Sequence, residues 1–233
     1  MTQESMKRLF RLAVWAVPTF AAVAVAGLGA YVAAAQQNQT RTNPLLTPGV
    51  QKAVAATGLA PVESFASIQS QKDRSVALYL EAAKVIEHPR CMNCHPVTRR
   101  PSQGDDMHSH IPPIKSDAAL FAAGIQCTSC HGPVNRPTNT AGIRSIPGAD
   151  PWQLAPLSMG WQTLTTGQIC ERLKDRAHNG DRSLEQIRVH LSEDHLVGWA
   201  WHPGEGRKPV PGTQEKFGHL ITAWIETGAY CPE

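Results

Sequence analysis

The feature that most constrains the fold of this chain is a five-residue motif that occurs twice. Cys91 to His95 reads CMNCH, and a second copy, CTSCH, begins 36 residues later and runs from Cys127 to His131. The motif Cys-x-x-Cys-His has a chemical basis: the two thiols add to the two vinyl groups of a haem, and the next residue, histidine, is placed to bind the iron. The order of these residues is specific to that chemistry. Two copies therefore predict two covalently bound haem c groups.

A zinc site and a pair of disulfides are the alternatives for the same cysteines. Two Cys-x-x-Cys pairs can bind zinc through four thiolates, but zinc does not explain why a histidine follows each pair. Disulfides inside Cys-x-x-Cys pairs are usually redox-active rather than structural. The haem hypothesis assigns both histidines as iron ligands, and it assigns six haem-binding residues: Cys91, Cys94, His95, Cys127, Cys130 and His131.

The first 40 residues predict a targeting segment. Lys7, Arg8 and Arg11 precede an uncharged, largely apolar stretch over 12–35, and basic residues beside such a stretch remain on the cytoplasmic side of the membrane. The stretch is long enough to anchor the chain in a bilayer, whereas its small terminal residues suit cleavage after Ala35. We therefore expect the rest of the chain on the periplasmic side of a bacterial inner membrane, either anchored by this helix or soluble after cleavage.

Two cysteines, Cys170 and Cys231, lie outside the motifs. An even remainder in an oxidising compartment predicts one disulfide between them; the alternative is two buried free thiols. A disulfide that closes a loop of about 60 residues contributes roughly 4 kcal/mol through loop-closure entropy.

The remaining pattern predicts a mostly α, loop-rich fold, with a tether over 41–73 and one dihaem domain over 74–233. The interval between the motifs is too short to enclose one haem by itself, so both haems are expected to share a core and to supply apolar surface that a loop-rich chain lacks. Helical periodicity over 74–87, ended by Pro89, predicts one inner face. That face comprises Val76, Leu80, Ala83 and Glu87, with Tyr79 and Ile86 beside it.

Capping residues predict where four further helices begin. A short helix is expected after Ser116, with Gly124 at its end. Another begins at Thr165 or Thr166. Ser183 and Gln186 form a capping box before the next, whose inner face holds Leu184, Ile187, His190 and Leu191. The last begins after Thr213 and ends at Gly228; apolar residues recur along it at i, i+3, i+4, i+7 and i+8, at Phe217, Leu220, Ile221, Trp224 and Ile225.

The second axial ligand of each iron is a separate question, because six-coordinate iron suits electron transfer and an open face suits catalysis. Met159 lies in a proline-bounded loop and is one candidate; its alternative role is to fill the core. His88, just before the first motif, is another candidate. His190 is a third, and its alternative role is that of a buried, hydrogen-bonded histidine.

Several stretches together resemble a family of small dihaem cytochromes c that occur with isoquinoline 1-oxidoreductase-type molybdenum hydroxylases and related dehydrogenases. The resemblance covers roughly residues 75–233 and rests on "HPRCMNCHP", "QGDD", "APLSMGW", "LVGWAW", "PVPGTQEKFG" and "AWIETGAYCP". It implies an electron carrier that accepts electrons from a dehydrogenase and passes them towards a respiratory acceptor. The "MHSHIPP" stretch between the motifs also resembles the small dihaem subunit of periplasmic nitrate reductase. That likeness implies His110 as an iron ligand, with His108 as its substitute.

Two other functions remain open at the level of sequence. One is a dihaem enzyme of the peroxidase type with an open distal site, although such proteins resemble two fused one-haem domains with wider motif spacing. The other is an accessory haem subunit of a membrane complex. Nucleic acid is not expected as a partner, because the net charge of +3 is small and no Lys/Arg run is present.

Overall fold

The computed structural model describes residues 43–45, 48, 58–140 and 143–233. The predicted targeting segment, residues 1–40, lies outside the described residues, as does part of the predicted tether over 41–73. Within the described ranges, no helix is long and apolar enough to cross a membrane.

The described part is mostly helical, and its strands are only two residues long. The α-helices are α3 (Gln71–Ile86), α4 (Pro89–Met92), α5 (Ala118–Ala122), α6 (Thr166–Lys174), α7 (Leu184–Glu193), α8 (His195–Gly198) and α9 (Gln214–Glu226). Single 3-10 turns are η1 (Val62–Phe65), η2 (Cys127–Ser129), η3 (Leu157–Met159) and η4 (Trp199–Trp201). Two antiparallel pairs complete the elements: β1 (Ser102–Gln103) with β2 (His108–Ser109), and β3 (Arg136–Pro137) with β4 (Ser145–Ile146).

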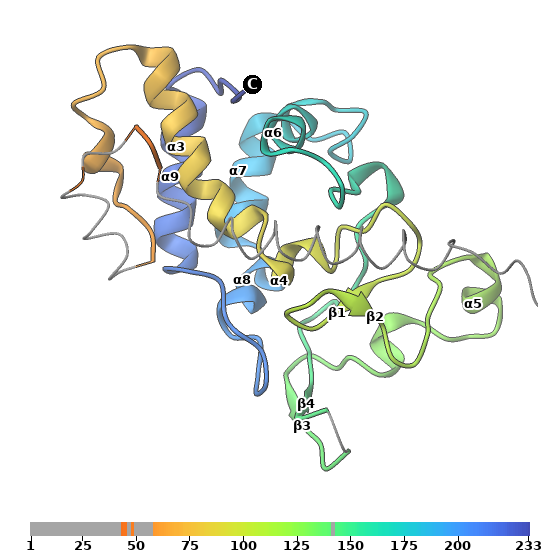
Figure 1. Cartoon of the computed structure of the whole chain (residues 1–233). Coiled ribbons are helices and arrows are strands. Elements are labelled where there is room, and N and C mark those ends of the chain that lie inside the picture. Colours follow the sequence, from red (N-terminus) through yellow and green to blue (C-terminus); the bar gives the residue numbers. More distant parts are fainter. Residues whose placement is uncertain (1–42, 46–47, 49–57, 141–142) are drawn as a thin grey trace, which may run out of the picture.

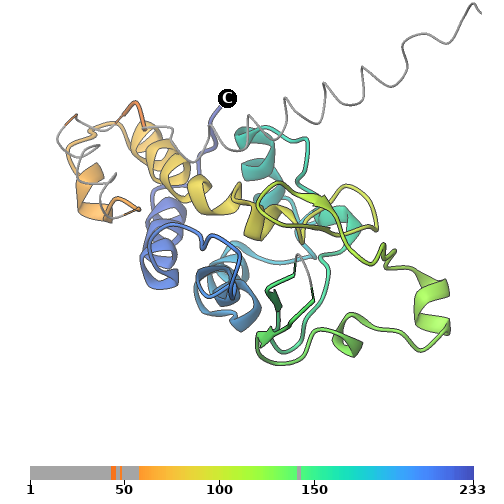
Figure 2. The same ribbon diagram turned by 60° about the horizontal axis from the view of Figure 1, so that its bottom comes forward.

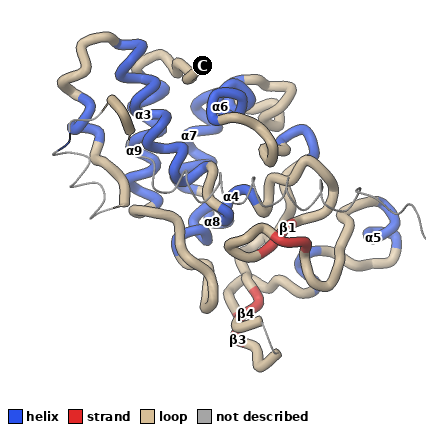
Figure 3. The backbone as a smooth tube through the Cα atoms, in the orientation of Figure 1, coloured by secondary structure: helices blue, strands red, loops and turns tan. Residues whose placement is uncertain are grey.

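The helices α3, α6, α7 and α9 gather on one side of the molecule, whereas α5 lies apart on the other side (Figure 1). α9 packs against both α3 and α7 (Figure 1), and Figure 2 shows the same grouping after a turn of the view. Trp224 of α9 is fully buried and meets Tyr79 of α3 at 5.3 Å between ring centres. Most of the chain between α4 and α6 is loop (Figure 3). The mostly α, loop-rich architecture is as predicted.

The predicted inner face of α3 is wrong in part. Val76, Leu80 and Glu87 are partly exposed, whereas the residues buried in this helix are Ser75, Ala77, Leu78, Tyr79, Glu81, Ala82, Ala83, Val85 and Ile86. The reason is that α9, η1 and α6 each contact α3, so more than one stripe is covered. Glu81 is tolerated inside because its carboxylate accepts a hydrogen bond from the Ala60 amide at 2.9 Å and pairs with Lys84 at 2.8 Å.

Helix ends follow the capping residues with two small differences. Thr165, Ser183 and Thr213 cap α6, α7 and α9 as predicted, each accepting a hydrogen bond from a backbone amide in the first turn. The cap of α5 is Asp117 rather than Ser116. Pro89 does not end α3, which has already stopped at Ile86; it is instead the first residue of α4, where its missing amide hydrogen costs nothing.

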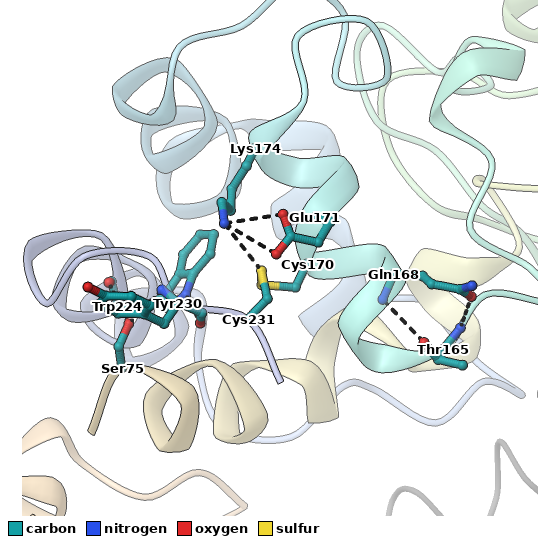
Figure 4. Close-up of a disulfide and its surroundings, with 9 residues drawn as sticks. All are labelled: Ser75, Thr165, Gln168, Cys170, Glu171, Lys174, Trp224, Tyr230 and Cys231. Atoms are coloured by element: carbon teal, nitrogen blue, oxygen red, sulfur yellow. Dashed lines mark hydrogen bonds and ion pairs between the residues drawn. A yellow bond between two sulfur atoms is a disulfide. The ribbon is translucent and has the colours of Figure 1, made fainter. Parts of the chain in front are cut away.

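A disulfide between Cys170 of α6 and Cys231 ties the C-terminal segment to the helical side, as the even remainder predicted (Figure 4). Lys174 lies beside it and pairs with Glu171. The same segment is held a second time by Ser75, whose hydroxyl donates to the Trp224 carbonyl at 3.2 Å and accepts from the Tyr230 amide at 3.0 Å.

Replacing Ser75 with alanine is expected to lower the free energy of unfolding by about 1–2 kcal/mol, because both bonds are lost inside the protein. Urea unfolding would measure the loss. Thr222→Ala is the matched control: it removes a hydroxyl that only bonds its own helix, to the Gly218 carbonyl, and should change stability by less than about 0.5 kcal/mol. Equal losses in the two variants would contradict this role of Ser75.

Candidate functional site

The first motif is positioned by the short helix α4. His88 caps α4, its Nδ1 accepting from the Arg90 amide at 3.2 Å. The turn then continues, because the Cys94 amide donates to the Cys91 carbonyl at 3.1 Å and the His95 amide to the Met92 carbonyl at 3.2 Å. Residues three or four apart in such a turn lie on one face. Both thiols and the His95 ring therefore line one cavity.

This first cavity has a volume of about 350 Å³, within the range of about 300–1,000 Å³ typical of cofactor pockets. Its walls are largely apolar. Ile86 of α3, Leu191 of α7 and Phe217 of α9 contribute to them, as do Met159, Trp161, Leu196, Val197, Trp199 and Ala200. Two cations, Arg90 and Arg182, also lie along the lining.

His95 is held so that one ring nitrogen remains free. Its Nδ1 lies 2.8 Å from the Met159 carbonyl, and a carbonyl can only accept, so Nδ1 carries the proton. The ring also stacks on Trp161, with 3.6 Å between centres and 7° between planes. Burial lowers the pKa of His95 to about 4. His95 is therefore a neutral imidazole whose Nε2 lone pair is available to a metal.

His190 of α7 lines the same cavity. Its Nδ1 lies 3.2 Å from a carboxylate oxygen of Asp194, and this hydrogen bond is the main reason that the pKa of Asp194 lies below its usual value. A proton on Nδ1, shared with this carboxylate, leaves the Nε2 lone pair unused, the arrangement usual for metal-binding histidines. Burial is the main reason that the pKa of His95 is lowered, and His190 adds to this effect.

The histidine of the second motif is held by the same two kinds of contact as His95, a backbone carbonyl and a tryptophan ring. Cys127 and the next two residues form η2, and His131 follows with its Nδ1 2.8 Å from the Pro147 carbonyl. The ring stacks on Trp152, with 4.8 Å between centres and 15° between planes. Burial lowers the pKa of His131. This imidazole too is neutral, with Nε2 left free.

His110 faces His131. Their ring centres are 5.9 Å apart and the planes lie at 65°. The Nδ1 of His110 is 2.8 Å from the Pro112 carbonyl, so it follows the same pattern. Two imidazoles that bind one metal from opposite sides, with bonds of about 2.0 Å as for zinc, have ring centres about 6 Å apart. The separation of the two rings is therefore compatible with one metal ion between His131 and His110.

Two of the four motif thiols have raised pKa values. Burial raises the pKa of Cys91 to about 12 and that of Cys94 to about 11, so both are neutral thiols in the absence of a bound group. In the part of the chain that the structure describes, no group of three or more His, Cys, Asp or Glu side chains could hold a metal ion. The thiol of Cys127 contributes to the raised pKa of Cys94, which places the two motifs near each other.

The structure gives the other candidate ligands different surroundings. His88 uses Nδ1 as an acceptor to cap α4, so its proton sits on Nε2 and no lone pair is free; burial lowers its pKa to about 4. His108 uses both ring nitrogens, towards Asp106 and Gln103. Met159 is buried along the first cavity, where its sulfur lies 3.9 Å from Arg182 and its carbonyl holds His95.

Sequence reasoning missed the residues that support the histidines. The Pro147 and Met159 carbonyls carry no side-chain signature, and Asp194 is visible only as an acidic residue one turn after His190. A usable signal was the concentration of tryptophan, because five of the six lie after residue 150, and two of them stack on the motif histidines.

Comparison of the chain with protein-family models, curated proteins and solved structures finds no match.

Proposed function

We propose that this chain is an exported dihaem c-type cytochrome that transfers electrons between proteins. One observation carries the proposal: the histidine of each Cys-x-x-Cys-His motif keeps Nε2 free, and a second histidine with the same constraint lies near it. The first pair is His95 with His190, and the second is His131 with His110. Four imidazoles with a free Nε2, together with two pairs of thiols, are the groups that two six-coordinate haem irons would require.

The residues present fit this cofactor. Cys91 and Cys94 would hold the first haem by thioethers, and Cys127 and Cys130 the second; burial keeps the first two thiols neutral. Bound haem would supply one-electron chemistry, with its iron alternating between ferrous and ferric states. The apolar walls of the first cavity exclude water and lower the local dielectric, conditions that tune a redox potential.

Electron transfer is favoured over catalysis because two histidines would hold each haem iron and leave no face open. A dihaem enzyme needs one iron face open to substrate. His190 is favoured over Met159 as the first distal ligand. The backbone carbonyl of Met159 already accepts a hydrogen bond from the His95 ring, whereas the His190 ring is oriented by Asp194 and keeps its Nε2 free.

The partners proposed are proteins. The family resemblance suggests a dehydrogenase, of the molybdenum hydroxylase type, as electron donor and a respiratory component as acceptor. The apolar stretch over 12–35 suggests a location on the periplasmic side of the inner membrane.

Near-infrared magnetic circular dichroism of the oxidised, haem-loaded protein would test this function. We expect two low-spin haems, both with the charge-transfer band of bis-histidine iron. A high-spin haem that binds carbon monoxide or peroxide would contradict the carrier function and favour an enzyme. A histidine–methionine band would keep the carrier but replace His190 by Met159.

A further inference from the structure

We infer that one segment, residues 147–161, orients the iron-binding histidines of both haems, and that Trp152 is its key positioning residue. We call these residues the proximal segment. The inference rests on the proposed function and deepens it, because it concerns how the two haem sites are built together.

The proximal segment wraps the first motif through its backbone. The Ala155 amide donates to the Cys94 carbonyl at 3.1 Å, and the Trp161 amide donates to the His95 carbonyl at 2.8 Å. The Met159 carbonyl accepts from the His95 ring, and Trp161 stacks on that ring. The approach is close: a Cβ at Gly160 would lie 2.7 Å from the Pro96 carbonyl oxygen. These contacts therefore fix both the backbone of His95 and the orientation of its ring.

The same segment performs both tasks for the second motif. Its first residue, Pro147, offers the carbonyl that accepts from His131, and Trp152 stacks on the His131 ring. Each motif histidine thus receives one carbonyl and one tryptophan from this short stretch. The repetition is not explained by core filling alone, since Trp152 is only partly buried.

Trp152 also connects the two sites. It meets Trp199 edge to face, with 4.9 Å between centres and 87° between planes, and Trp199 lines the first cavity. Trp199 is itself fixed, because its indole nitrogen donates to the Asn135 side-chain oxygen at 2.8 Å. That oxygen also accepts from the Gly148 amide of the proximal segment at 3.0 Å. A continuous contact therefore runs from His131 through Trp152 and Trp199 to the first cavity.

The expected role is to set ligand orientation and basicity. The plane of an axial imidazole and the strength of its Nδ1 hydrogen bond are the features through which surroundings tune a metal. Removing the indole that stacks on His131 frees the ring to rotate. The electronic signature of the second haem should then change although every iron ligand remains.

Trp152→Leu, Trp152→Phe and Trp201→Leu in the haem-loaded chain provide the test. Trp201 is the matched control, because its ring packs on Phe217, whereas Trp161 and Trp152 are the rings that stack on the motif histidines. Low-temperature electron paramagnetic resonance and a redox titration would be recorded, with the haem count taken from the intact mass. The first-haem signal can be assigned with His190→Ala.

Trp152→Leu is expected to shift the g values and midpoint potential of the second haem. Trp152→Phe, which keeps a flat ring, should stay close to the wild type, and Trp201→Leu should lower stability without moving either signal. Loss of the second haem from Trp152→Leu with retention in Trp152→Phe supports the same role. Unchanged signals and potentials in Trp152→Leu would overturn the inference while leaving the proposed function intact. A wild-type chain without haem would overturn both.

Discussion

Replacing His190 with alanine in the haem-loaded protein is expected to convert the first haem from low-spin to high-spin iron. His190 is the imidazole that shares the first cavity with His95, and an alanine cannot supply a sixth ligand. The second haem should remain low-spin, because His110 and His131 are untouched. Electron paramagnetic resonance would show the new high-spin signal, and carbon monoxide should bind one haem per chain instead of none.

Met159→Leu is the matched comparison. It removes the thioether but keeps the backbone carbonyl that holds His95, so both haems should stay low-spin. The reverse result, a high-spin haem in Met159→Leu and none in His190→Ala, would show that Met159 is the ligand.

Removing the disulfide by Cys170→Ser with Cys231→Ser is expected to lower the free energy of unfolding by about 4 kcal/mol, since the bond closes a loop with a sequence separation of 61. Guanidinium unfolding of the haem-loaded protein would measure the loss. The spectrum of the first haem should not change, because neither cysteine lines the first cavity. Wild-type protein unfolded under reducing conditions is the control and should lose a similar amount. A loss below about 1 kcal/mol would show that the tie contributes little.

Local features of the fold could be predicted from sequence because they depend on neighbours along the chain. The caps Thr165, Ser183 and Thr213 bond to amides within three residues. The apolar spacing of α9 also held: Phe217, Leu220, Ile221 and Trp224 are buried, and Ile225 is partly buried. The pairing of Cys170 with Cys231 followed from arithmetic, since no other cysteine lay outside the motifs.

Features set by distant contacts could not be predicted in the same way. Which residues of α3 are buried depends on three elements that pack around it, including η1 and α9. The prediction of a single buried face for this helix was therefore wrong in part. The support of His95 by Met159 spans 64 positions, and it comes from a backbone atom that any residue possesses. The sequence marked His110 and His190 as candidates, but only the fold brings each beside a motif histidine.

The intact mass of the chain, produced in cells that attach haem c, tests the central claim most directly. We predict the polypeptide plus two haems, falling to one haem when Cys91 and Cys94 are both replaced by alanine. A mass without haem, with the motif cysteines oxidised or holding zinc, would contradict the account.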